Sequence, residues 1–121
     1  MTKAAKFSDM KYLDHNPGQW FLLEWQGALY LDYRYSYSAI IDDSAFMKLS
    51  DEECRQYKAR GRAYLSELAT AAHNSGPYRK ESSFYERNLY NGPNSKELRS
   101  AVSAAVVDQT WTAEQHRKNN N

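Results

Sequence analysis

Few side chains in this sequence have the types and spacing that catalysis or metal binding requires. The three histidines, His15, His73 and His116, lie far apart, and the single cysteine, Cys54, leaves no zinc-binding pattern. There is also no phosphate-binding loop, no dinucleotide fingerprint and no Gly-x-Ser-x-Gly turn. The sequence therefore predicts no catalytic residues, no metal site and no cofactor, and it does not favour an enzyme.

Two features could still do chemistry. Cys54 falls in the first turn of an expected helix, where the helix dipole would favour the thiolate, but the acidic residues 51–53 beside it oppose that effect. Asp42 and Asp43 follow the end of an apolar strand, where paired carboxylates could bind a metal or act as acid and base. Acidic pairs at strand ends are more often turn residues. We therefore expect Cys54 to be an ordinary buried thiol, and Asp42 and Asp43 to be turn residues that end the strand.

Basic residues gather at two places, on the same expected helix and directly after Tyr78. Together with exposed tyrosines they could hold a nucleotide or a single strand by stacking and phosphate contact. Most of those on the helix lie opposite its apolar stripe, where a solvated face is the ordinary explanation, and the formal net charge of the chain is only +1. Nucleic acid is therefore an unfavoured partner. The residues are Arg55, Lys58, Arg60, Arg62, Arg79 and Lys80.

The elements that must position these residues begin with a β-hairpin from Trp20 to Ile41. Its second arm alternates almost residue by residue, which is typical of a strand with one buried face. One parity is apolar or aromatic and the other is polar. The first set is Leu29, Leu31, Tyr33, Tyr35 and Tyr37, and the second is Asp32, Arg34, Ser36 and Ser38.

The register of this hairpin depends on its turn. A three-residue loop at 25–27, with a glycine bulge, would pair Leu23 with Leu29 and bring the two apolar sets onto one face. A two-residue turn at 26–27 would instead pair Leu23 with Tyr30. We prefer the three-residue loop, because it brings the two apolar sets together. A slip of one residue would move every side chain of an arm to the other face.

A long amphipathic helix is expected from Asp51 to Asn74. Ser50 and Glu53 form a capping box, and apolar residues follow at steps of three and four. Gly61 lies inside this stripe at a cost of about 1 kcal/mol in helix propensity, so we expect it to allow a close approach to a strand or an aromatic ring. Gly61→Leu should then be poorly tolerated.

The rest of the chain completes an α+β fold. Residues 7–13 could add a short strand or a helical turn, 46–49 an edge strand or a lead into the helix, and 83–90 and 95–109 shorter helices. The predicted architecture has two layers, an antiparallel sheet built on the long hairpin and packed against the long helix, with one or two C-terminal helices beside it. We expect one domain over residues 1–112 and a disordered tail over 113–121.

Composition suggests how such a domain would work. The chain has 121 residues and ten tyrosines at a mean hydropathy of −0.87, and no apolar stretch is long enough for a membrane span. A soluble, cytoplasmic protein with no membrane partner is the simplest interpretation. We expect a non-catalytic protein-binding module, an inhibitor, immunity-type or adaptor protein, or a self-associating homodimer, that uses its tyrosine- and tryptophan-rich hairpin. The candidate binding residues are Trp20, Tyr30, Asp32, Arg34, Tyr35 and Tyr37.

Two alternatives remain open. One is a small-ligand or nucleotide-binding protein, or an enzyme, with a pocket between sheet and helices whose polar groups would be tyrosine hydroxyls, Arg34 and the pair Asp42 and Asp43. The other is a domain in which every tyrosine is structural.

Overall fold

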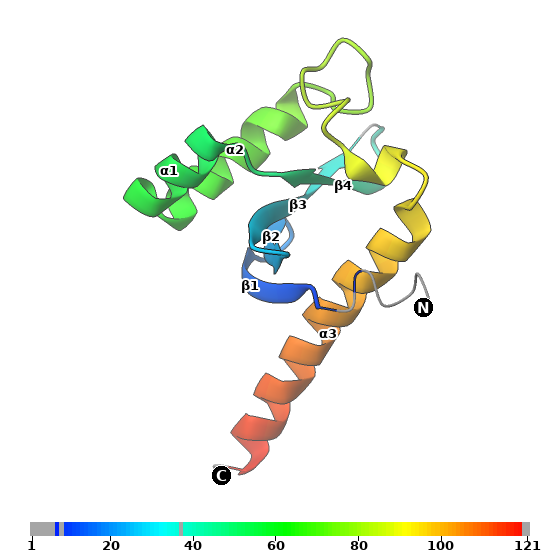
Figure 1. Ribbon diagram of the computed structural model, residues 1–121. Helices are drawn as coiled ribbons and strands as arrows, with labels where there is room; N and C mark the ends of the chain where they lie inside the picture. Colours follow the sequence, from blue (N-terminus) through cyan, green and yellow to red (C-terminus); the bar gives the residue numbers. More distant parts are fainter. Residues whose placement is uncertain (1–6, 8, 37, 120–121) are drawn as a thin grey trace.

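A four-stranded antiparallel sheet lies at the centre of the molecule, and helices cover both of its faces (Figure 1). The computed structural model describes residues 7, 9–36 and 38–119, with the backbone alone for 108–119. The strands neighbour one another in chain order, which confirms the α+β class, but the helices on both faces make three layers where two are predicted. The elements are β1 (Lys11–Asn16), β2 (Trp20–Trp25), β3 (Ala28–Ser36), β4 (Asp42–Lys48), α1 (Asp51–Arg60), α2 (Arg62–Asn74), the 3₁₀ helix η2 (Leu89–Asn91) and α3 (Ser95–Asn119).

The α2 face of the sheet is the side covered by α2, with α1 beside it. Its core is mainly apolar, because alternate residues of the strands meet the small and branched residues of one stripe of α2. Cys54 and Tyr57 of α1 pack against this core and are half-buried, so the thiol is less buried than the sequence predicts. The buried members are Trp20, Leu22, Leu31, Tyr33, Tyr35, Ala45, Met47, Leu49, Leu65, Ala69 and Ala72.

The α3 face is the opposite side, covered by η2 and by the first half of α3. Its core uses the other parity of β2, β3 and β4, so each of these three strands contributes to both cores. Figure 1 shows α3 crossing this face and then running past β1, beyond the body of the molecule. The buried members are Phe7, Met10, Leu23, Tyr30, Phe46, Tyr90, Leu98 and Val102.

The turn between β2 and β3 has two residues, not the preferred three. Gln26 and Gly27 have φ values of 52° and 77°, the positive pair that a type I′ hairpin turn requires. Leu23 therefore pairs with Tyr30. The preferred register is wrong because it assumes one apolar face, whereas here both faces are buried and both apolar sets find a core.

Gly61 divides the predicted long helix into α1 and α2. Its φ of 70° and ψ of −149° lie in a region that residues with a side chain rarely adopt, and a Cβ built there would meet nothing within 4 Å. The expected close approach to the sheet is therefore wrong. The glycine is needed for the backbone conformation that changes the chain direction between α1 and α2. The capping box at Ser50 and Glu53 is present as predicted.

Arg87 ties the segment after α2 to the rest of the molecule. Its guanidinium donates to both carboxylate oxygens of Glu53, at 2.9 and 2.6 Å, and to the carbonyl of Lys48 at 2.9 Å. Burial favours the neutral form of Glu53, but the hydrogen bonds from Arg87 and from the backbone of Ser50 outweigh it and lower the pKa of this carboxyl. One carboxylate therefore caps α1 and anchors the segment.

On both edge strands, side chains form hydrogen bonds with backbone groups. On β4, the N–H of Phe46 donates to Asn88 Oδ1 at 3.0 Å, and on β1 the carbonyl of His15 accepts from Arg62 at 2.6 Å. Groups occupied in this way are less available for pairing with a strand from another chain.

Three further predictions about the chain change. Asp42 and Asp43 do not end a strand but begin β4, and η2 with a series of turns replaces the short helix predicted over 83–90. The backbone of α3 continues through Asn119, so residues 113–119 are helical where the sequence predicts a disordered tail. Residues 120 and 121 lie outside the described part of the chain.

Candidate functional site

The aromatic residues predicted to form a binding surface are core residues. Trp20, Tyr30 and Tyr35 are 1%, 8% and 6% exposed. Trp20 lies on the α2 face, where its indole N–H donates to Ser66 Oγ at 3.0 Å, and Tyr30 lies on the α3 face, stacked on Phe46. Helices cover both faces of the hairpin, so these three side chains are core residues, a point that the sequence leaves open.

The other predicted binding residues have three different surroundings. Arg34 is exposed and lines a hollow of about 400 Å³ with Tyr35 and His73, at the end of the sheet beside α2. Asp32 is buried at 7% exposure on the α3 face. Tyr37 lies outside the described residues. The structure therefore separates the predicted set instead of gathering it.

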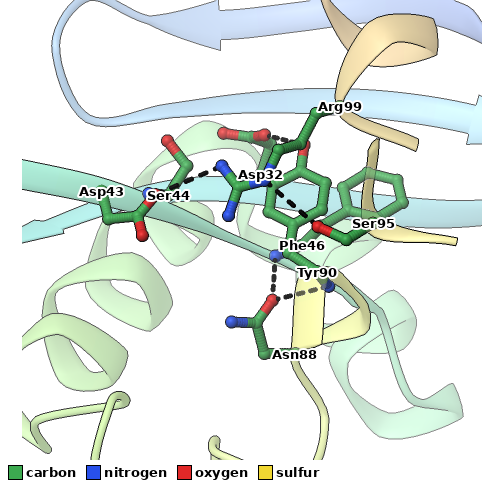
Figure 2. A network of polar contacts seen from close by, with 8 residues as sticks. All are labelled: Asp32, Asp43, Ser44, Phe46, Asn88, Tyr90, Ser95 and Arg99. Carbon is green, nitrogen blue, oxygen red and sulfur yellow. Dashed lines mark hydrogen bonds and ion pairs between the residues drawn. The ribbon is translucent and has the colours of Figure 1, made fainter. Parts of the chain in front are cut away.

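Asp32 is the most unusual of these residues, because it is a carboxylate in the middle of a buried strand. In the sheet it lies between Phe21 of β2 and Phe46 of β4. Its Oδ2 accepts a hydrogen bond from the hydroxyl of Tyr90 at 2.5 Å, and Figure 2 shows this pair at the centre of a polar network. A buried carboxylate costs free energy unless it is hydrogen-bonded or paired, so its surroundings determine what it can do.

Asn88 holds Tyr90 in place. Its side-chain oxygen accepts from two backbone N–H groups, those of Tyr90 and Phe46, both at 3.0 Å (Figure 2). The ring of Tyr90 also stacks on that of Phe46, with centroids 5.4 Å apart. A single amide thus joins η2 to the edge of the sheet and directs the Tyr90 hydroxyl at Asp32.

Arg99 of α3 covers the same network from the other side. Its guanidinium lies 4.2 Å from the centre of the Tyr90 ring, close enough for a cation–π contact. It donates to Asp43 at 3.2 Å and to Ser95 at 3.3 Å. Asp43 therefore takes part in this network as an ion-pair partner, not as the predicted turn residue.

Burial dominates the electrostatics of Asp32. It raises the pKa of this carboxyl from 3.8 to about 6, although the hydrogen bond from Tyr90 and the positive charges of Arg99 and Arg34 act in the opposite direction. Burial and the negative charge of Asp32 together raise the pKa of Tyr90 above its usual value, so Tyr90 stays a hydrogen-bond donor at neutral pH. Burial thus moves the pKa of Asp32 towards neutral pH.

A groove of about 310 Å³ opens beside this network, between the sheet and α3. Sheet residues and Tyr90 line one side, and residues at helical spacing on α3 line the other. A volume of this size lies at the lower end of the range for small-molecule sites, about 300–1,000 Å³. The lining residues are Phe21, Asp32, Ser44, Tyr90, Arg99, Val102, Ser103, Val106 and Val107.

No protein-family model, curated protein or solved structure matches this chain. Within the described residues, no helix is both long and apolar enough to cross a bilayer, and no group of three or more potential metal ligands occurs.

The histidines and the basic residues do not converge on a site in the part of the chain whose side chains are described. His15 of β1 stacks on Phe21, whereas His73 lies at the end of α2. The basic residues of α1 and α2 that form ion pairs do so with exposed or half-buried acidic residues of this chain. The pairs are Arg55 with Glu52, Arg60 with Glu67 and Arg62 with Asp14.

Sequence reasoning singled out Asp32 but missed its partners. Tyr90 contacts it across a separation of 58 residues, and no local pattern marks that contact. The available signal was the position of Asp32 itself, a charged residue in a strand whose neighbours on both sides are apolar. Such a residue predicts a polar partner without identifying it.

Proposed function

We propose that this protein binds another protein through the end of the molecule where β3 turns into β4. The observation that carries this proposal is the exposure of two neighbouring isoleucines in that turn. Ile40 is 91% exposed and Ile41 is 43% exposed. The hydroxyl of Ser38 accepts from both of their backbone N–H groups, at 3.3 and 3.0 Å, which supports a turn that presents them to solvent. Covering one isoleucine would contribute about 1.5–3 kcal/mol.

The loop after α2 adds a third apolar side chain at the same end. Tyr78 is 40% exposed, its ring stacks on that of Tyr35, and the guanidinium of Arg79 lies 5.5 Å from its centre. Ser36 at the end of β3 and Tyr78 line one hollow, which brings the turn and the loop together. Scattered exposed apolar residues are ordinary, but a cluster with tyrosine and arginine has the composition of an interaction site.

The charges around this cluster favour an acidic partner. Arg34 and Arg79 line the adjoining hollows, while the carboxylate of Asp42 in this region accepts a hydrogen bond from Ser36 at 2.5 Å. A partner with an apolar centre and acidic side chains around it would complement such a surface and would be steered towards it. This relocates the predicted binding surface from the face of the hairpin to its far end.

A photo-crosslinking residue tests the proposal in cells that produce the protein. Placed at Ile40, it should give a discrete crosslinked product that mass spectrometry identifies. Placed at Leu13, which is 44% exposed on the outer strand β1, it should not. A product at both positions, or at neither, would contradict the proposal. A product with twice the mass of the chain would identify the partner as a second copy.

The identified pair then allows a quantitative check. The double variant Ile40→Ser, Ile41→Ser should bind at least about tenfold more weakly while its melting temperature stays close to that of the original protein, because these side chains contribute little to the core. Leu13→Ser is the matched control and should bind normally.

A further inference from the structure

The groove beside Asp32 contains a buried negative charge whose partners are incomplete. Among the described residues, Asp32 accepts one hydrogen bond, from Tyr90, and it belongs to no ion pair. A carboxylate can accept about four hydrogen bonds. Its second oxygen is not among the described buried atoms that lack a partner, and Asp32 lines the groove. This oxygen therefore faces the groove rather than sealed protein.

Neither of the nearby positive groups, Arg99 and Arg34, forms an ion pair with Asp32 among the described residues. Arg99 lies over the ring of Tyr90 and donates to Asp43 and Ser95, as Figure 2 shows. Arg34 lies two residues after Asp32 on β3, but its side chain is exposed and lines a different hollow. The described residues thus supply long-range compensation to Asp32 but no direct countercharge.

The walls of the groove around Asp32 are mainly apolar. Phe21 from the sheet and Val102 and Val106 from α3 are apolar, and Val107 at the rim is 58% exposed. Besides Asp32, the polar members of the lining are Tyr90, Arg99 and the hydroxyl groups of Ser44 and Ser103. One carboxylate surrounded mainly by apolar walls does not suit a metal ion, which needs several oxygen ligands.

We propose that this groove binds a small protonated amine with an apolar substituent. Its ammonium group donates to the free oxygen of Asp32, and its hydrocarbon part lies against Phe21, Val102 and Val106. The amine supplies the missing countercharge, and its apolar part lies against the apolar lining of the groove. This site is separate from the surface proposed for protein binding, which lies at the Ile40 end of the sheet, so each can fail without the other.

Titration of the labelled protein with n-alkylammonium ions, from ethyl to hexyl, tests this proposal directly. Amide resonances of the groove, around residues 21, 32, 44 and 102–107, should shift in a saturable way, and affinity should increase with chain length as more hydrocarbon is covered. The corresponding n-alkanols, which lack the charge, should bind at least about tenfold more weakly. Absence of saturable shifts, shifts located elsewhere, or equal affinity for the alkanols would overturn the proposal.

Two variants and a control separate the parts of the site. Asp32→Asn keeps an acceptor for Tyr90 but removes the charge, and it should lower the affinity for hexylammonium at least about tenfold. Ser103→Trp places a large side chain at the exposed wall of the groove and should block binding with Asp32 intact, so the test does not depend on the folding of one variant. Glu97→Gln removes an exposed carboxylate of α3 outside the groove and should change nothing. Unchanged affinity in both groove variants would also overturn the proposal.

Discussion

Two neighbouring residues of β3 show how differently the two faces of this sheet treat polar groups. Asp32 points to the α3 face, where its carboxylate has a hydrogen-bond partner and borders a groove. Tyr33 points to the α2 face, where it is 1% exposed and its hydroxyl is the only described buried side-chain atom without a partner. The α2 face is thus built for packing, even at the cost of an unsatisfied hydroxyl, whereas the α3 face keeps a polar group accessible. This difference supports the ligand site proposed on the α3 side.

The largest effect expected from this comparison is on the pH dependence of stability. The pKa of Asp32 is raised on folding, from 3.8 to about 6, so the folded state binds the proton more tightly than the unfolded state. Its contribution to stability is therefore full below about pH 4 and is lost as the pH rises towards 6, by a total of about 3 kcal/mol. Asp32→Asn should be close to neutral at pH 4 and should raise the free energy of unfolding by about 2–3 kcal/mol at pH 7.5.

Urea denaturation of both proteins across this pH range measures the difference. The groups that act on Asp32 are Tyr90, Arg99, Arg34 and Asp43, and all of them remain in the variant. If Asp32→Asn were equally or less stable at pH 7.5, the carboxylate would be compensated in the folded state and the α3 face would be as closed as the α2 face.

The next effect concerns the helical layer on the α2 face. Gly61→Ala should cost about 1–3 kcal/mol, because alanine rarely adopts the positive φ found there. Gly61→Leu should cost about the same, since a Cβ at this position meets no atom within 4 Å. Thermal unfolding of the two variants distinguishes backbone strain from the close packing that the sequence suggests. A much greater loss for leucine than for alanine would support close packing.

A smaller pair of effects compares the two tyrosine hydroxyls. Tyr90→Phe removes the hydrogen bond to Asp32 and should lower stability by about 1.5–3 kcal/mol, because a buried carboxylate loses its partner. Tyr33→Phe removes a hydroxyl that has no partner and should leave stability unchanged or raise it by about 1 kcal/mol. Calorimetry at neutral pH measures both. Equal losses for the two variants would mean that the hydroxyl of Tyr33 is satisfied in solution.

Local features of this chain could be predicted from the sequence, and long-range features could not. The capping box at Ser50 and Glu53, the strand alternation after Ala28 and the α+β class follow from patterns within a few residues. The hairpin register could not be chosen correctly, because it depends on α3 covering the second face. The turn type was also difficult to recognise from the sequence, because glutamine is not a typical residue at a position with a positive φ such as that of Gln26.

The candidate site illustrates the same limit. The sequence places Asp32 in the polar parity of its strand and among the candidate binding residues, but the groove exists only because η2 and α3 return to that face and bring Tyr90 and Arg99. The aromatic residues Trp20, Tyr30 and Tyr35 resembled an interface because tyrosine and tryptophan suit both cores and surfaces. Composition alone cannot separate these two uses.

The most direct test of the difference between the two faces is the pKa of the Asp32 carboxyl itself. The carboxyl carbon of Asp32 can be followed by NMR from pH 3 to 8, with Asp32→Asn used to assign its resonance. A midpoint near 6 would confirm that the α3 face holds a buried carboxylate that titrates close to neutral pH. A midpoint at or below the usual aspartate value of about 3.9 would contradict it, because the carboxylate would then be fully compensated or fully solvated in the folded protein.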